Sequence, residues 1–112
     1  MLKKEQRLTK DKEFDQIFKQ GYSSYDKILG IKATKNDLEH SRFGILISTK
    51  VSKKSVERNL IKRRIREILQ QVAPSFKVPV NLAVIVLPTA KDKSFQELEN
   101  SIKFNLKKLR LT

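Results

Sequence analysis

The sequence predicts an α+β fold in which a small mixed sheet packs against helices. Apolar residues alternate along residues 27–34 and 42–49, and residues 80–87 are almost continuously apolar, which indicates three strands. Three other segments repeat apolar residues at helical spacing. These elements follow one another without a linker or an internal repeat, so we expect a single domain, residues 1–112, with one core.

The chain is expected to start with a basic arm and a first helix. Residues 1–8 carry several cations and are expected to be flexible. Thr9 is a candidate N-cap, and Gly21 is expected at the C′ position after the helix. Three apolar residues share one helical face: Phe14, Ile17 and Phe18. From these residues alone, the two phenylalanines are better explained as core than as side chains that stack on bases.

The predicted strands differ in how they use their two faces. In residues 27–34, Leu29 and Ile31 point one way, whereas Gly30 and Lys32 point the other way and suit the floor of an open groove. Residues 42–49 follow a polar loop, which favours a hairpin with the preceding strand. Residues 80–87 suit an inner strand covered on both faces and parallel to its neighbour, because a strand–helix crossover precedes them.

The central helix combines an apolar face with a basic face. Residues 50–66 contain eight cations and one acid, Glu57. At 100° per residue, one side collects Ile61, Ile65, Ile68, Leu69 and Val72, and the other collects Asn59, Lys62, Arg63 and Arg66. Ser52 and Ser55 are candidate N-caps, and the pattern fades at Pro74. An amide among long cations can grip phosphates and hydrogen-bond sugars or bases. A merely solvated face is less well supported, because such faces usually mix charges of both signs.

The last helix is expected to begin with a capping box at residues 94–97, SFQE. Its buried stripe consists of Phe95, Leu98, Ile102, Leu106 and Leu109.

The overall charge makes nucleic acid the leading class of partner. Lys and Arg number 25 against 12 acids, which gives a net charge of +13. The absence of cysteine excludes disulfides and thiolate metal sites. No signal-peptide or membrane-spanning pattern is seen, so we expect a cytoplasmic protein without a membrane partner. One loop histidine and scattered acids form no catalytic or metal-binding constellation, so we assign no catalytic residue and no metal ligand.

Two segments resemble the bacterial ribonuclease P protein component. Residues 49–67, TKVSKKSVERNLIKRRIRE, resemble its signature of a Lys-Lys pair, an Arg-Asn-Arg triplet, a Lys-Arg pair and a further Arg. The matching residues are Lys50, Lys53, Lys54, Arg58, Asn59, Lys62, Arg63 and Arg66. Leu60 departs from the pattern, since the triplet usually ends in Arg. Residues 8–21, LTKDKEFDQIFKQG, resemble the family's first helix.

The resemblance implies the order αβββαβα, with a short extra strand near residues 22–25. It also implies a left-handed strand–helix–strand crossover, whereas the general rule favours a right-handed one. By the same resemblance, the eight signature residues face the catalytic RNA. Phe14 and Phe18, with Lys32 on the open face of the sheet, form a groove for single-stranded leader RNA.

The resemblance further implies a non-catalytic subunit of an endoribonuclease that removes the 5′ leader of precursor tRNA. The RNA subunit and its magnesium ions carry out the chemistry, and no protein partner is required. The partners are then ribonuclease P RNA and precursor tRNA. The main alternative is a structural or ribosomal RNA-binding protein with no role in cleavage. A DNA-binding regulator and a nuclease that acts without RNA are less well supported.

Overall fold

The computed structural model describes residues 11–36 and 38–112, so the predicted basic arm and Thr9 lie outside the described residues. The element order is α1 (Asp11–Gln20), β1 (Tyr22–Tyr25), β2 (Leu29–Lys35), β3 (Arg42–Leu46), α2 (Ser55–Val72), β4 (Val80–Val86) and α3 (Phe95–Lys108), with short 3-10 turns η2 (Ala73–Ser75) and η3 (Pro88–Asp92). The expected αβββαβα order is confirmed, and the short extra strand is β1.

The four strands form one mixed sheet in the order β1-β2-β4-β3. β4 pairs in parallel with β3 and antiparallel with β2. The predicted hairpin between residues 27–34 and 42–49 is therefore wrong. β4 occupies the place between them, because its side chains are mostly buried on both faces and only an inner position covers both.

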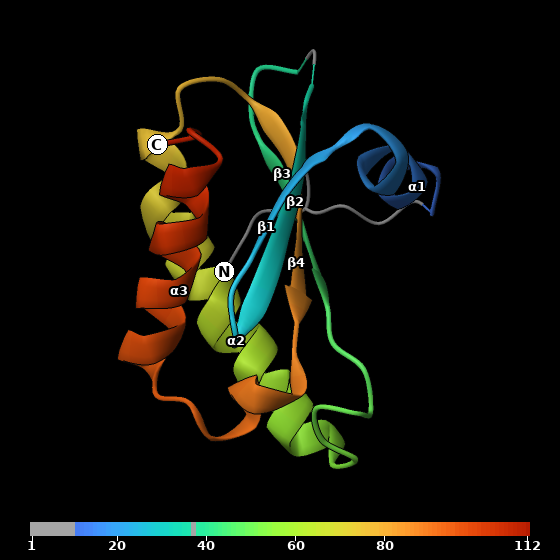
Figure 1. Ribbon diagram of the computed structural model, residues 1–112, viewed down its shortest axis with the longest axis vertical. Helices are drawn as coiled ribbons and strands as arrows, with labels where there is room; N and C mark the ends of the chain where they lie inside the picture. The colour runs from blue at the N-terminus through green and yellow to red at the C-terminus, as the bar shows by residue number, and fades with distance from the viewer. Residues whose placement is uncertain (1–10, 37) are drawn as a thin grey trace.

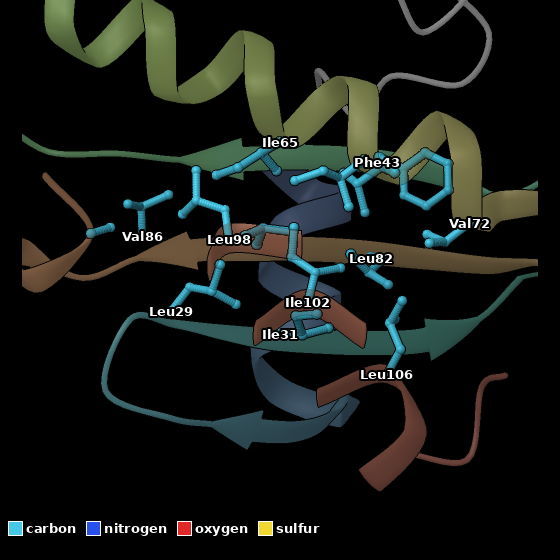
Figure 2. Close-up of a cluster of buried hydrophobic side chains, with 14 of the residues drawn as sticks. Leu29, Ile31, Phe43, Ile65, Val72, Leu82, Val86, Leu98, Ile102 and Leu106 are labelled. Atoms are coloured by element: carbon cyan, nitrogen blue, oxygen red, sulfur yellow. The ribbon is translucent and has the colours of Figure 1, made fainter. Parts of the chain in front are cut away.

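The sheet separates α1 from the other two helices. Figure 1 shows α2 and α3 together on one side of the sheet and α1 on the other. Viewed from the α2 side with both strands pointing up, β4 lies to the left of β3, so the crossover through α2 is left-handed (Figure 2). This sense agrees with the resemblance and departs from the general rule.

The main core lies between the sheet and the pair α2 and α3. Figure 2 shows Leu29 and Ile31 of β2, Leu82 and Val86 of β4 and Ile65 of α2 within one cluster of buried side chains. Five residues of α2 are buried, as its apolar stripe predicts: Ile61, Ile65, Ile68, Leu69 and Val72. On the opposite face, Ile17 of α1 is buried with Ala83 of β4, and Phe14 packs against them. The first helix is thus anchored to the sheet by Ile17.

Two local expectations are corrected by the backbone. Gly21 follows α1, and its N–H donates to the carbonyl oxygen of Ile17 at 2.8 Å, but none of the described glycines has positive φ. Glycine is needed here for a steric reason instead, because a Cβ at position 21 would lie 2.3 Å from the carbonyl oxygen of Ile17. The N-cap of α2 is Lys54, which has no side-chain cap, so neither Ser52 nor Ser55 fills that role.

Ser52 stabilises the loop before α2 in another way. Its hydroxyl accepts a hydrogen bond from the N–H of Lys54 and donates one to Glu57 at 2.9 Å. Ser52 is buried, two residues before the cap, because these bonds hold it inside the loop. The predicted capping box of the last helix is confirmed, since Ser94 and Glu97 each accept a hydrogen bond from the other's backbone N–H. In the described part of the chain, no helix is both long enough and apolar enough to cross a membrane.

A polar network joins the turn between β1 and β2 to α3. The Asp26 carboxylate accepts hydrogen bonds from the N–H groups of Ile28 and Leu29, at 2.8 and 3.0 Å, and from the Ser101 hydroxyl. Burial raises the pKa of the Asp26 carboxyl, but its hydrogen bonds, including one with Asn105, outweigh that effect and lower the pKa below its ordinary value.

Asp26→Ala is expected to lower the free energy of unfolding by roughly 1–3 kcal/mol, because it leaves several polar groups near α3 without their acceptor. Since the folded pKa is depressed, the contribution of the carboxylate is complete above the ordinary aspartate pKa of about 3.9 and is lost as the pH falls below it. Urea unfolding at neutral and acidic pH measures both effects. The exposed Asp92 supplies the control, and an Asp92→Ala loss equal to that of Asp26→Ala contradicts the prediction.

Candidate nucleic-acid interface

The solvent side of α2 carries a basic stripe, which we define as Asn59, Lys62, Arg63 and Arg66. All four line one surface depression of about 630 Å³, together with Glu67 and Gln70. Asn59 and Arg63 are exposed, whereas Lys62 and Arg66 are half-buried. Half-burial of a long cation packs its aliphatic stem against the protein and leaves the charged group near the surface. The structure thus brings together the four residues that the helical pattern placed on one side.

None of the cations in the basic stripe forms a salt bridge with another described residue. The two ion pairs found among the described residues are Lys93–Glu97 and Lys103–Glu99, both at α3. The charges of Lys62, Arg63 and Arg66 are therefore available to an external anion. Because Arg presents a planar fork of donors, it can bind a phosphate through two hydrogen bonds.

A second group of cations lies in the loop before α2. Lys50, Lys53 and Lys54 are exposed and line a separate depression with Lys91 of η3. Glu57 is the acid that lines this depression. Sequence patterns did not single out Lys91, because it is far from the signature in the chain. Only the folded structure shows that η3 lies beside the loop before α2. We call these four lysines the loop cluster.

Arg58 belongs to neither group of surface residues. Its side chain is half-buried, and Nη1 donates a hydrogen bond to the carbonyl oxygen of Ser52 at 2.8 Å. It therefore connects the first turn of α2 to the loop that carries Lys53 and Lys54. Replacing Arg58 is expected to change the conformation of that loop as well as to remove a charge.

The face of the sheet that packs against α1 brings together the three predicted groove residues, Phe14, Phe18 and Lys32. The Phe18 side chain is 41% exposed, and the ammonium group of Lys32 lies 5.1 Å from the centroid of its ring. Phe14 is half-buried and packs against Ile17 and Ala83. Of the two phenylalanines, Phe18 is therefore the one open to a ligand, and Phe14 mainly supports α1. A cation beside an exposed ring offers both charge and a surface for stacking.

The described residues contain no group of three or more His, Asp or Glu side chains that could hold a metal ion. The oxygen ligands near the basic surfaces are the carboxylates of Glu57 and Glu67, in different depressions. Magnesium in proteins is usually held by one or two carboxylates together with phosphates and water. These residues therefore do not fit a metal site built by the protein alone. What the arrangement can do is bind a folded polyanion at α2 and a single strand on the opposite face of the sheet.

Comparison with known proteins gives one consistent result. A family model described as Ribonuclease P matches residues 2–110. The ribonuclease P protein component of Ligilactobacillus salivarius is 34% identical over 107 residues, which cover 95% of this chain and 94% of the relative. That of Alkaliphilus metalliredigens is 29% identical over 105 residues and 94% of each chain.

Solved structures agree with the sequence relatives. A Staphylococcus aureus ribonuclease P protein mutant with defective mRNA degradation activity superposes with a TM-score of 0.90 at 30% identity, covering 97% of this chain and 92% of the other. The ribonuclease P protein of Thermotoga maritima gives a TM-score of 0.78 at 25% identity over 88% of this chain and 92% of the other. The similarity extends over nearly the whole chain in each case.

Proposed function

The chain belongs to the ribonuclease P protein family, and from this premise we propose which RNA each of its two surfaces binds. Members of the family are the protein component of an endoribonuclease whose chemistry is carried by RNA, and RNA binding in tRNA processing is their role. The chain is thus a non-catalytic subunit that works with ribonuclease P RNA in an enzyme that needs a divalent metal.

We assign the α2 side of the protein to the catalytic RNA. The basic stripe and the loop cluster together present seven cations and an amide, and Arg58 holds the loop before α2 through its hydrogen bond to Ser52. A folded RNA offers phosphates over an extended surface, which suits two neighbouring cationic depressions better than a single pocket. The main support for this assignment is that one depression is lined by Asn59, Lys62, Arg63 and Arg66. None of these four side chains is part of the buried core.

We assign the opposite face of the sheet to the 5′ leader of precursor tRNA. Phe18 and Lys32 lie there with the half-buried Phe14 behind them. Leader sequences vary between tRNAs, and stacking combined with backbone charge tolerates any base. The protein thereby raises the affinity of the enzyme for precursor over mature tRNA.

We further propose the identity of the metal, the partners and the cellular location. The divalent metal is magnesium held mainly by the RNA, which agrees with the lack of a fitting donor set in the described residues. No protein partner is required, the protein works in the cytoplasm, and residues 1–112 act as one RNA-binding domain. A structural RNA-binding protein without a role in cleavage is the alternative.

Reconstitution tests this function. The chain is added to a bacterial ribonuclease P RNA at low magnesium with precursor tRNA as substrate. We expect restored cleavage at the mature 5′ end and tighter binding of precursor than of mature tRNA. Unchanged cleavage, with RNA binding intact, would support the structural alternative. Omitting the RNA is the control for a nuclease that acts alone.

Leu60 offers a gain-of-contact test of the α2 assignment. It stands where the family signature usually has Arg, and its side chain is exposed one position after Asn59. Leu60→Arg is expected to tighten binding to the catalytic RNA and to steepen the log–log salt dependence by about 0.7–0.9, the contribution of one phosphate contact. Leu60→Gln, which adds polarity without charge, should leave the slope unchanged. A slope that is the same for both variants contradicts the prediction.

A further inference from the structure

The face of the sheet that carries Lys32 has a second exposed aromatic ring, that of Tyr25. Tyr25 pairs with Gly30 across β1 and β2, and Tyr22 pairs with Ala33. Paired residues of antiparallel strands point to the same face, and successive residues alternate. Ala33 is part of the main core under α2 and α3, so Tyr22 points to that side. Tyr25 points to the other side, the side of Lys32 and α1.

Gly30 lets the Tyr25 ring lie directly on the strand. A Cβ at Gly30 would lie 2.1 Å from Cε2, 2.2 Å from Cδ2 and 2.7 Å from Cζ of that ring. Any other residue at position 30 would therefore displace the tyrosine. Tyr25 remains 45% exposed, so the ring rests on the sheet and still presents surface to solvent.

The ring lies on the same face of the sheet as Lys32, and residues on the neighbouring strands lead from it toward the β3 edge. Lys32 is two residues from Gly30 along β2, a rise of about 7 Å on the same face. Across the sheet, away from β1, Gly30 pairs with Ile85 of β4. Leu46 of β3 pairs with Ile85 in turn. Leu46 and Ile85 line one depression with Lys62 of the basic stripe. A row of apolar side chains thus crosses the sheet from Tyr25 to the edge beside α2.

We propose that Tyr25, held flat by Gly30, is a stacking platform for a base of single-stranded RNA, distinct from Phe18. A strand that passes Phe18 and Lys32 then meets a second ring on its way across the sheet toward Lys62. The occupant is the leader of the precursor, since the site offers rings and a nearby cation but no pattern of donors that would select one base. This inference rests on the proposed function of the groove.

The test measures binding of precursor and mature tRNA to the reconstituted holoenzyme. Tyr25→Ala is expected to weaken precursor binding about 10-fold and to leave mature tRNA binding unchanged, whereas Tyr25→Phe keeps the affinity for precursor. Tyr22→Ala is the matched control, because it removes a tyrosine that is 75% exposed on the other face of the same strand. Equal precursor affinities of Tyr25→Ala and Tyr22→Ala overturn the proposal, as does an equal loss for mature tRNA.

A double-mutant cycle separates stacking from a folding defect. Gly30→Ala displaces the ring without removing it, so it should weaken precursor binding in the parent and have no further effect in Tyr25→Ala. Tyr25→Leu keeps apolar bulk without a π-face and is expected to behave like Tyr25→Ala. Full precursor affinity of Tyr25→Leu, or full additivity of Gly30→Ala with Tyr25→Ala, contradicts the proposal. If the parent protein itself does not favour precursor over mature tRNA, the proposed function fails rather than this inference alone.

Discussion

Replacing Lys62, Arg63 and Arg66 together by alanine is expected to weaken binding to the catalytic RNA by roughly 100-fold or more. A hydrogen bond to a charged group contributes about 1.5–3 kcal/mol, and about 1.4 kcal/mol corresponds to a factor of ten. All three cations line one depression, and none is paired with another described residue. Affinity measured across a salt titration should also lose about 0.7–0.9 of log–log slope for each phosphate contact removed.

The matched control is a triple alanine variant of α3. Lys103, Lys107 and Lys108 are exposed, and their replacement lowers the net charge by the same amount. If position matters, this variant binds the RNA nearly as well as the parent protein does. Equal losses in the two triple variants would show that total charge, not the basic stripe, governs assembly.

Phe18→Ala is expected to weaken binding of leader-bearing precursor by about 5- to 150-fold, since stacking of one base on an aromatic ring contributes about 1–3 kcal/mol. The ring is exposed and lies beside Lys32, so its loss removes a stacking surface without opening the main core. Binding of mature tRNA should not change. The affinities of the holoenzyme for both substrates measure the effect.

Phe104→Ala provides the control for Phe18→Ala. Phe104 of α3 is 52% exposed, and the ammonium group of Lys108 lies 5.4 Å from its ring centroid, so the local chemistry is nearly the same. Its helix, α3, lies on the other side of the sheet from α1 (Figure 1). A similar loss in both variants, or a loss for Phe18→Ala that is equal for precursor and mature tRNA, contradicts the groove assignment.

Helical periodicity predicted the two sides of α2 correctly. Its apolar positions, such as Ile61 and Ile65, are buried, and Asn59 and Arg63 lie together at the surface. This was possible because rotation by 100° per residue relates neighbouring side chains within one helix. The capping box at Ser94 was predictable for the same reason, since its partners are three residues apart.

Contacts between distant segments were harder to predict. The sequence suggested a hairpin for residues 27–34 and 42–49, because a polar loop separates two apolar patterns. The position of β4 between them depends on the burial of a segment about 40 residues away. The left-handed crossover has no local signal, so only family resemblance indicated it. The place of Lys91 in the loop cluster was also not predictable from local patterns. It depends on the position of β4 in the sheet, because η3 directly follows β4.

The role of single side chains depended on details that patterns do not show. Arg58 matched the basic signature, but its guanidinium group is bonded to the Ser52 carbonyl. Phe14 and Phe18 share one helical face, yet only Phe18 is exposed, because Phe14 packs beside Ile17. The register of β1 places Tyr22 and Tyr25 on opposite faces of the sheet, which the sequence pattern alone does not show.

Site-directed cross-linking tests most directly the claim that α2 binds the catalytic RNA while the opposite face of the sheet binds the leader. The sequence has no cysteine, so a single introduced cysteine carries the photoreactive probe. Asn59→Cys marks the basic stripe, Ser23→Cys marks the groove beside Lys32, and Asn100→Cys on α3 is the control. In the holoenzyme bound to precursor tRNA, we expect Asn59→Cys to cross-link to the catalytic RNA, Ser23→Cys to the leader and Asn100→Cys to neither. Cross-links from Asn59→Cys and Ser23→Cys to the same RNA, or an exchange of their targets, would contradict the account.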